Sequence, residues 1–122
     1  MNILILGAGG REHTFAWKIS QSPLCKQLFV APGNAGTSEI ATNISISVND
    51  FEAIKKCCIE EKIELLLVGP EEPLVKGITD FLISDPDLKD LDIIGPSVTA
   101  LVTNYETALA AADAVSRQAT AG

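Results

Sequence analysis

A chain of 122 residues is long enough to bury one hydrophobic core, and 47% hydrophobic residues with a net charge of −7 are typical of a folded domain. The acidic balance argues against nucleic-acid binding, which needs basic patches. Because no apolar run approaches the roughly 20 residues of a membrane span and the N-terminus enters a strand without a secretory signal, we expect a cytoplasmic protein without a membrane partner.

The cysteines Cys25, Cys57 and Cys58 are odd in number and lack the spacing of a metal site. We expect free cytoplasmic thiols. For Cys57 and Cys58 we favour burial against neighbouring elements over catalysis, because no histidine lies nearby in the sequence.

The strongest candidate for a binding site lies at residues 3–13. The apolar residues 3–6 predict a strand that is buried on both faces. Gly7, Gly9 and Gly10 then allow a sharp turn and a close approach to a ligand. A helix pattern follows at once, so free backbone N–H groups converge where an anion, usually a phosphate, binds. The alternative is a plain turn whose glycines only make room for the helix.

This loop departs from the dinucleotide fingerprint Gly-x-Gly-x-x-Gly. Gly7 and Gly9 match its first two positions, but Glu12 stands in place of the third glycine. The second predicted strand, residues 26–31, runs into Pro32 instead of ending in an acidic residue that would hold a ribose. Both departures count against NAD or FAD and make an NAD-dependent oxidoreductase the weakest hypothesis.

The following residues alternate between strand and helix patterns. We predict a glycine-rich loop over residues 32–37, strands over 44–48, 64–68 and 92–94, and helices over 51–61 and 73–84. This order predicts an α/β, Rossmann-like open parallel sheet with helices on both faces. Ligands of such sheets bind beyond the carboxyl ends of the strands, where the loops 7–13, 32–37 and 69–74 would meet.

Four blocks of this sequence closely resemble one known family. They are GAGGREH at residues 7–13, APGNAGT at 31–37, VGPEEPLVKG at 68–77 and IGPS at 94–97. The family is phosphoribosylamine–glycine ligase, also called glycinamide ribonucleotide synthetase, of the ATP-grasp superfamily. It joins 5-phosphoribosylamine to glycine with ATP and Mg²⁺ in purine synthesis. The resemblance implies that residues 1–97 form its Rossmann-like (pre-ATP-grasp) N-terminal domain, which contributes binding of phosphoribosylamine.

The resemblance also implies substrate-binding roles for individual residues. Main-chain N–H groups at Gly9 and Gly10 would hold the 5-phosphate, and Arg11 would add a bidentate contact. The pair at residues 33–34 would lie against the ribose or the phosphate. Glu71 would accept hydrogen bonds from ribose hydroxyls or the amine. The six implied residues are Gly9, Gly10, Arg11, Gly33, Asn34 and Glu71.

Each of these roles has a plainer alternative. Arg11 can solvate the helix start or pair with Glu12. Asn34 can stabilise only its own turn, and Glu71 can be a solvated charge favoured by a helix dipole. For His13, the only histidine, a structural hydrogen bond is favoured over acid–base catalysis.

Beyond residue 97 the sequence departs from the family. Residues 98–122 form an alanine-rich tail, which we expect to be helical over 107–115 or partly disordered. The family's ATP-grasp lysines, Mg²⁺ carboxylates and glycine site lie in parts that this chain lacks, so we assign it no catalytic, cofactor or metal-binding residue. We expect it to be inactive alone and to expose an interdomain surface through which copies could self-associate.

Two further hypotheses for function stand beside the oxidoreductase. The first is the phosphoribosylamine-binding domain of the purine ligase. The second is a stand-alone Rossmann-type module that binds a nucleotide or a sugar phosphate. Because fold does not decide function, the hypotheses are distinguished by the ligand that binds. Ribose 5-phosphate should stabilise the chain under the first hypothesis, and NADH should do so only under the oxidoreductase hypothesis.

Overall fold

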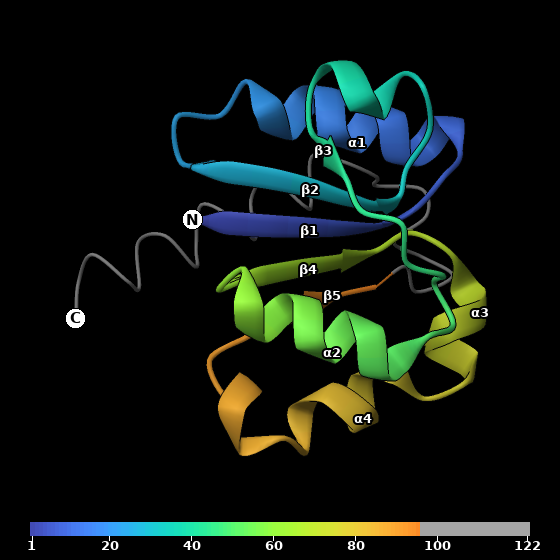
Figure 1. Ribbon diagram of the computed structural model, residues 1–122, viewed down its shortest axis with the longest axis vertical. Helices are drawn as coiled ribbons and strands as arrows, with labels where there is room; N and C mark the ends of the chain where they lie inside the picture. The colour runs from blue at the N-terminus through green and yellow to red at the C-terminus, as the bar shows by residue number, and fades with distance from the viewer. Residues whose placement is uncertain (96–122) are drawn as a thin grey trace.

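A computed structural model describes residues 1–95 of the chain. The tail that we expect over residues 98–122, its predicted helix and the end of the fourth family block lie outside the described residues. The elements follow in the order β1 (Asn2–Gly7), α1 (Gly10–Ser20), β2 (Gln27–Pro32), η1 (Thr37–Glu39), β3 (Thr42–Asn43), α2 (Phe51–Glu60), β4 (Leu65–Val68), α3 (Glu71–Val75), α4 (Ile78–Ile83), η2 (Pro86–Leu88) and β5 (Asp92–Ile94) (Figure 1).

The five strands of the described part form one parallel sheet in the order β3-β2-β1-β4-β5. From β1 the chain moves outward to β2 and β3. It then returns to the other side of β1 to add β4 and β5. The strand order therefore reverses between β1 and β4, which is where ligands bind in open α/β sheets. The predicted α/β, Rossmann-like parallel sheet is confirmed.

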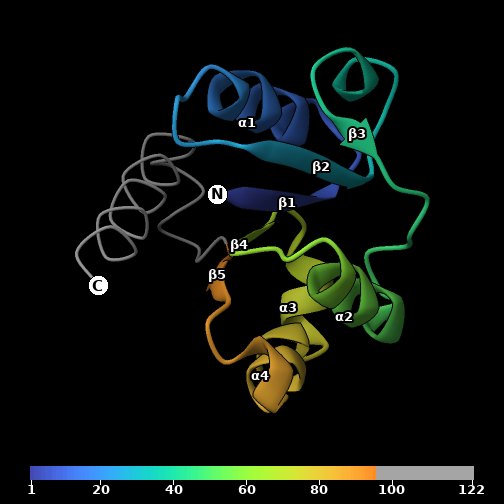
Figure 2. The same ribbon diagram turned by 60° about the vertical axis from the view of Figure 1, so that its left-hand side comes forward.

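Alternate strand residues separate into two hydrophobic layers. In β1, Leu4 and Leu6 face the layer that α2 and α4 close, whereas Ile3 and Ile5 face the layer that α1 closes. Figure 2 shows α1 on one side of the sheet and α2 with α4 on the other. Because both faces are covered, β1 and β4 are continuous apolar runs rather than alternating ones, and the predicted helices on both faces are confirmed.

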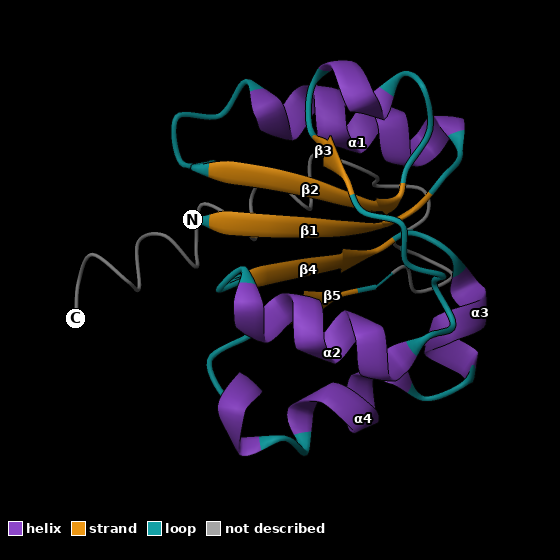
Figure 3. Ribbon diagram, in the orientation of Figure 1, coloured by secondary structure: helices purple, strands orange, loops and turns teal. Residues whose placement is uncertain are grey.

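The strand predicted over residues 44–48 is wrong. The edge strand β3 ends before it, as Figure 3 shows. The Ile44 N–H still donates to Val30 O at 2.8 Å, but the Ile46 N–H then donates back to Ile44 O at 2.8 Å, which turns the chain. Ile44, Ile46 and Val48 nevertheless pack against the layer under α2. The alternation thus predicted burial correctly, whereas sheet pairing depended on where β2 lies.

The single helix predicted over residues 73–84 is also wrong, because the structure has two. Gly77 lies between α3 and α4 with φ of +89° and ψ of +26°, in the left-handed region. A residue in that region cannot continue a right-handed helix, and glycine adopts it without strain. The chain therefore changes direction at Gly77, and α4 packs beside α2.

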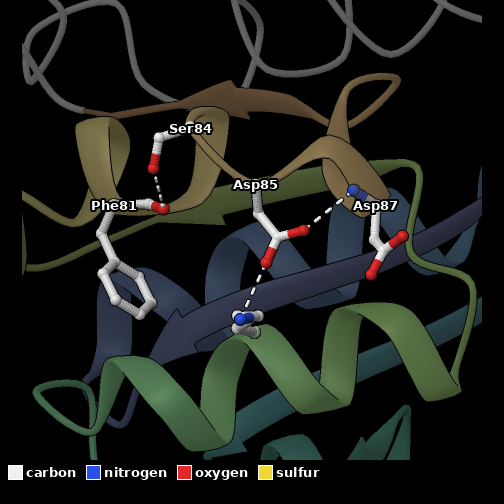
Figure 4. Close-up of polar contacts among 5 residues, drawn as sticks. Phe81, Ser84, Asp85 and Asp87 are labelled. Carbon is white, nitrogen blue, oxygen red and sulfur yellow. Dashed lines mark hydrogen bonds and ion pairs between the residues drawn. The ribbon is translucent and has the colours of Figure 1, made fainter.

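Asp85 joins the end of α4 to α2. Its carboxylate accepts a hydrogen bond from the Asp87 N–H at 2.8 Å (Figure 4) and lies 2.8 Å from Lys55 Nζ. The hydrogen bond from Lys55, and after it the one from the Asp87 backbone, lower the pKa of Asp85. The rings of Phe51 and Phe81, with centroids 5.7 Å apart, pack between the same two helices. This layer is thus held by paired charges as well as by apolar contacts.

Candidate binding site at the carboxyl edge of the sheet

Three loops leave the carboxyl ends of β1, β2 and β4 at one edge of the sheet (Figure 1). Their backbones are hydrogen-bonded to the ends of the strands: Gly33 N–H donates to Gly7 O at 3.0 Å, and Gly69 N–H donates to Leu6 O at 3.1 Å. The convergence predicted for these loops is therefore confirmed. It places the start of α1 at the switch point between β1 and β4.

The start of α1 carries backbone donors without helical acceptors. Gly9 is the N-cap residue and no side chain caps the helix. The His13 N–H donates to Gly9 O at 3.1 Å, so the N–H groups of Gly10, Arg11 and Glu12 precede the first helical bond. Gly10 lies open, because a Cβ there would have no heavy atom within 4 Å. Such a helix start attracts a negative charge.

Arg11 extends from this first turn as an exposed side chain. Within residues 1–95 it forms no ion pair, with Glu12 or with any other residue. For this part of the chain the alternative in which Arg11 pairs with Glu12 is wrong. The guanidinium therefore adds an unpaired positive charge beside the free N–H groups. A contact of Arg11 with phosphate stays a prediction.

Asn34 connects the second loop to the first. Its Nδ2 donates to Ala8 O at 2.8 Å, and its Oδ1 accepts from the Thr37 N–H at 3.0 Å. The turn-stabilising role that the sequence left open is confirmed, and the cross-loop bond to Ala8 is an addition to it. Contact of a ligand with Gly33 or Asn34 stays a prediction.

Thr37 and Asn43, which sequence reasoning missed, support this loop from inside the protein. Thr37 is completely buried, and its Oγ1 donates to Asn43 Oδ1 at 2.7 Å. Asn43 Nδ2 donates to Asn34 O at 2.8 Å. Gly33 has φ of +76° and lies against Asn43, so a side chain would not fit there. The available signal was the spacing of Asn34 and Thr37, which is typical of a side-chain-stabilised turn.

Glu12 is buried at the switch point, with 6% of its surface exposed. Its side chain lies against two glycines that end neighbouring strands: a Cβ on Gly69 would lie 2.7 Å from Glu12 Oε1, and a Cβ on Gly7 would collide with the carboxyl group. Sequence reasoning noted Glu12 only as a departure from a fingerprint. The signal that could have found its place was the glycine after each of two predicted strands.

His13 and Glu71 border the site in different ways. The half-buried ring of His13 packs on Gly36, where a Cβ would lie 2.7 Å from His13 Cε1. The ring forms no hydrogen bond with another described residue, so packing replaces the structural hydrogen bond that we predict. Glu71, the first residue of α3, is exposed. Its contact with a ligand stays a prediction.

The described residues contain no group of three or more His, Cys, Asp or Glu that could hold a metal ion. Cys57 and Cys58 are buried, as predicted. Burial, with a smaller contribution from Cys57, raises the pKa of Cys58 to about 12, so this thiol stays protonated and unreactive.

None of the helices in residues 1–95 has the length and apolar character needed to cross a membrane.

The fold and this site define a Rossmann-like α/β domain with a candidate anion-binding loop at its switch point. Residues 1–102 match the family described as "Phosphoribosylglycinamide synthetase, N domain", and the chain belongs to this family. The resemblance noted in the sequence is therefore confirmed.

The chain is also similar to named proteins and to one solved structure. The chain is 47% identical over 102 residues to phosphoribosylamine–glycine ligase of Escherichia coli K12, covering 82% of this chain and 23% of that protein. It is 56% identical over 78 residues to the human trifunctional purine biosynthetic protein adenosine-3, covering 62% and 8%. A crystal structure of phosphoribosylamine–glycine ligase from Thermotoga maritima aligns with a TM-score of 0.48 at 30% identity, covering 59% and 16%. The chain thus spans less than a quarter of these relatives.

Proposed function

We propose that this domain binds the phosphoribosylamine substrate of a purine-biosynthesis ligase that joins 5-phosphoribosylamine and glycine with ATP. The names of the relatives support the ligase and its pathway. The observation that carries the binding role is the start of α1, where three N–H groups without helical acceptors stand beside the guanidinium of Arg11, which has no ion-pair partner within residues 1–95. A phosphate monoester matches that arrangement in charge and in hydrogen bonding.

In this proposal the phosphate of the substrate lies at Gly9, Gly10 and Arg11. The ribose extends across the switch point toward Gly33 and Glu71, the residues at the starts of the second and third loops. Asn34 holds the first two loops together through its bond to Ala8 O. The binding energy then comes from fixed backbone donors, which need no reorganisation when the phosphate arrives.

We assign no contact with ATP or Mg²⁺ to residues 1–95, whose donor groups do not form a metal-binding cluster. We expect the isolated chain to bind a sugar phosphate without catalysing ligation. Purified chain with phosphoribosylamine, glycine and Mg-ATP should release no ADP above the background rate. Turnover at about 1–10³ s⁻¹, which is typical of enzymes, would contradict this expectation.

The binding proposal is tested by titrating the full 122-residue chain with ribose 5-phosphate, ribose and NADH. Ribose 5-phosphate should bind and raise the unfolding midpoint, because a ligand of the native state alone stabilises it. Arg11→Ala should weaken its binding by about tenfold to hundredfold, the value of a charge-assisted hydrogen bond. The matched control is Lys18→Ala in the last turn of α1. Binding of NADH but not of ribose 5-phosphate would overturn the proposal.

A further inference from the structure

The buried carboxylate of Glu12 is unused in the proposed phosphate contact. It lies in the first turn of α1 at the junction of β1 and β4, with 94% of the residue's surface removed from solvent. An ionised carboxylate with so little exposure is costly unless a positive charge or hydrogen-bond donors compensate it. A donor that compensates the Glu12 carboxylate is therefore required.

The glycines around Glu12 keep space for its carboxyl group. A Cβ on Gly69 would lie 2.7 Å from Oε1 and 2.8 Å from the fixed backbone oxygen of Leu6, and a Cβ on Gly9 would lie 3.3 Å from Oε2. Gly7, with φ of +139°, is the third glycine against which the Glu12 side chain packs. The side chain is therefore confined between the first and third loops, at the point where the sheet's strand order reverses.

Within residues 1–95, Glu12 forms no hydrogen bond or ion pair. Its oxygens are not sealed in either, because the only fully enclosed side-chain oxygen or nitrogen without a partner in this part of the chain is Asn2 Oδ1. The small exposed part of Glu12 thus includes both carboxylate oxygens, beside the glycines of the first and third loops. Buried polar groups without a protein partner call for a ligand or water to complete them.

We propose that Glu12 is a specificity-determining residue, whose carboxylate accepts hydrogen bonds from hydroxyl or amine groups on the sugar end of the ligand. This inference rests on the proposed function, which supplies the phosphate anchor on the outer side of the loop. Arg11 and the helix N–H groups then hold the phosphate, and Glu12 holds the donor-bearing end. The two opposite charges orient the ligand across the switch point.

The same carboxylate disfavours a dinucleotide. In the dinucleotide fingerprint the third glycine leaves room for close packing, and the pyrophosphate lies against the glycine turn. Here Glu12 fills that room and brings a negative charge to within 3.3 Å of the position of a Gly9 Cβ. A pyrophosphate that crossed the turn would meet this charge, whereas a single phosphate at Arg11 would leave the space beside Glu12 to the sugar.

The test compares wild-type chain and Glu12→Gln with three probes: ribose 5-phosphate, methyl phosphate and inorganic phosphate. Glutamine keeps the shape and removes the charge. Ribose 5-phosphate should bind the variant about tenfold or more weakly, whereas methyl phosphate and inorganic phosphate should bind it equally or more tightly. Glu52→Gln, an exposed carboxylate on α2, is the matched control and should leave all three affinities unchanged.

The outcomes separate this inference from the function on which it rests. If wild-type chain binds ribose 5-phosphate and Glu12→Gln binds it equally, or if the variant loses all three probes alike, Glu12 is a structural residue and the inference is overturned alone. If wild-type chain binds none of the probes, both proposals fall. If Glu12→Gln does not unfold cooperatively, the affinities of the wild-type chain test the inference instead. A preference of less than tenfold for ribose 5-phosphate over methyl phosphate would then overturn it.

Discussion

The starts of α1 and α2 differ in how their first N–H groups are satisfied. At α2, Asp50 caps the helix by accepting a hydrogen bond from the Ala53 N–H at 3.2 Å. At α1 the N-cap is Gly9, which has no side chain to offer. A side-chain cap stabilises a helix but occupies its anion-binding end. The chain thus caps the helix that only packs and leaves uncapped the one that lies at the switch point.

The same contrast extends to charged side chains. On the α2 and α4 side, Lys55 pairs with Asp85 at 2.8 Å. At the carboxyl edge, Arg11 and Glu12 remain unpaired with the described residues. The exposed Arg11 gains no stability from a partner in this part of the chain, and the buried Glu12 is costly without one. Their presence at one edge supports a role in binding.

We expect the largest effect on stability at the carboxyl edge of the sheet. Gly7→Ala should lower the free energy of unfolding by about 3 kcal/mol or more, because a Cβ would collide with Glu12 and φ of +139° strains any side chain. The matched control is Gly10→Ala, where the space is open and a helical alanine should cost nothing or stabilise by up to about 1 kcal/mol. Urea denaturation measures both.

A double variant separates the two causes. Adding Glu12→Ala to Gly7→Ala removes the collision and leaves the strained backbone, so part of the lost stability should return. If Gly7→Ala unfolds at the wild-type urea concentration, Glu12 does not occupy the space assigned to it.

An intermediate effect is expected at the capped helix. Asp50→Ala should lower the free energy of unfolding by about 1 kcal/mol, the usual cost of losing an N-cap acceptor, without altering the affinity for ribose 5-phosphate. Asp50→Asn keeps an acceptor and should be nearly neutral. A loss of affinity in Asp50→Ala would show that the two helix starts are coupled and would break the comparison between them.

The smallest effect concerns pH. Because Lys55 lowers the pKa of Asp85, the ion pair contributes stability above the unfolded-state pKa of Asp, about 3.9, and this contribution disappears as the pH falls through the lower folded pKa. The difference in urea midpoint between wild type and Lys55→Met should therefore be present at pH 7 and shrink at low pH. A difference that is equally large at the lowest pH would assign the effect to packing of the Lys55 stem instead.

The family blocks in the sequence placed the candidate site on three loops that the structure brings to one edge of the sheet, but they did not describe how its side chains are used. Asn34 was expected at the ligand, and the structure engages its amide with Ala8 and Thr37. Thr37 escaped notice although its spacing from Asn34 was a local signal, and Asn43 escaped notice because its partners lie in an earlier turn of the chain. Glu12 was visible only as the wrong residue for a dinucleotide loop.

By itself the sequence determined the alternation of strands and helices, the parallel sheet, the three loops at its carboxyl edge and the family. These follow from contiguous residues, because apolar runs, glycine turns and the residue order within short blocks all extend over a few positions. Only the tertiary structure decided that residues 44–48 leave the sheet, that Gly77 divides a helix, and that Glu12 fits between Gly7 and Gly69. The place of Glu12 depends on residues brought together from distant parts of the chain, which no local pattern specifies. The breaks at residues 44–48 and at Gly77 are backbone conformations that the apolar patterns of their segments do not reveal.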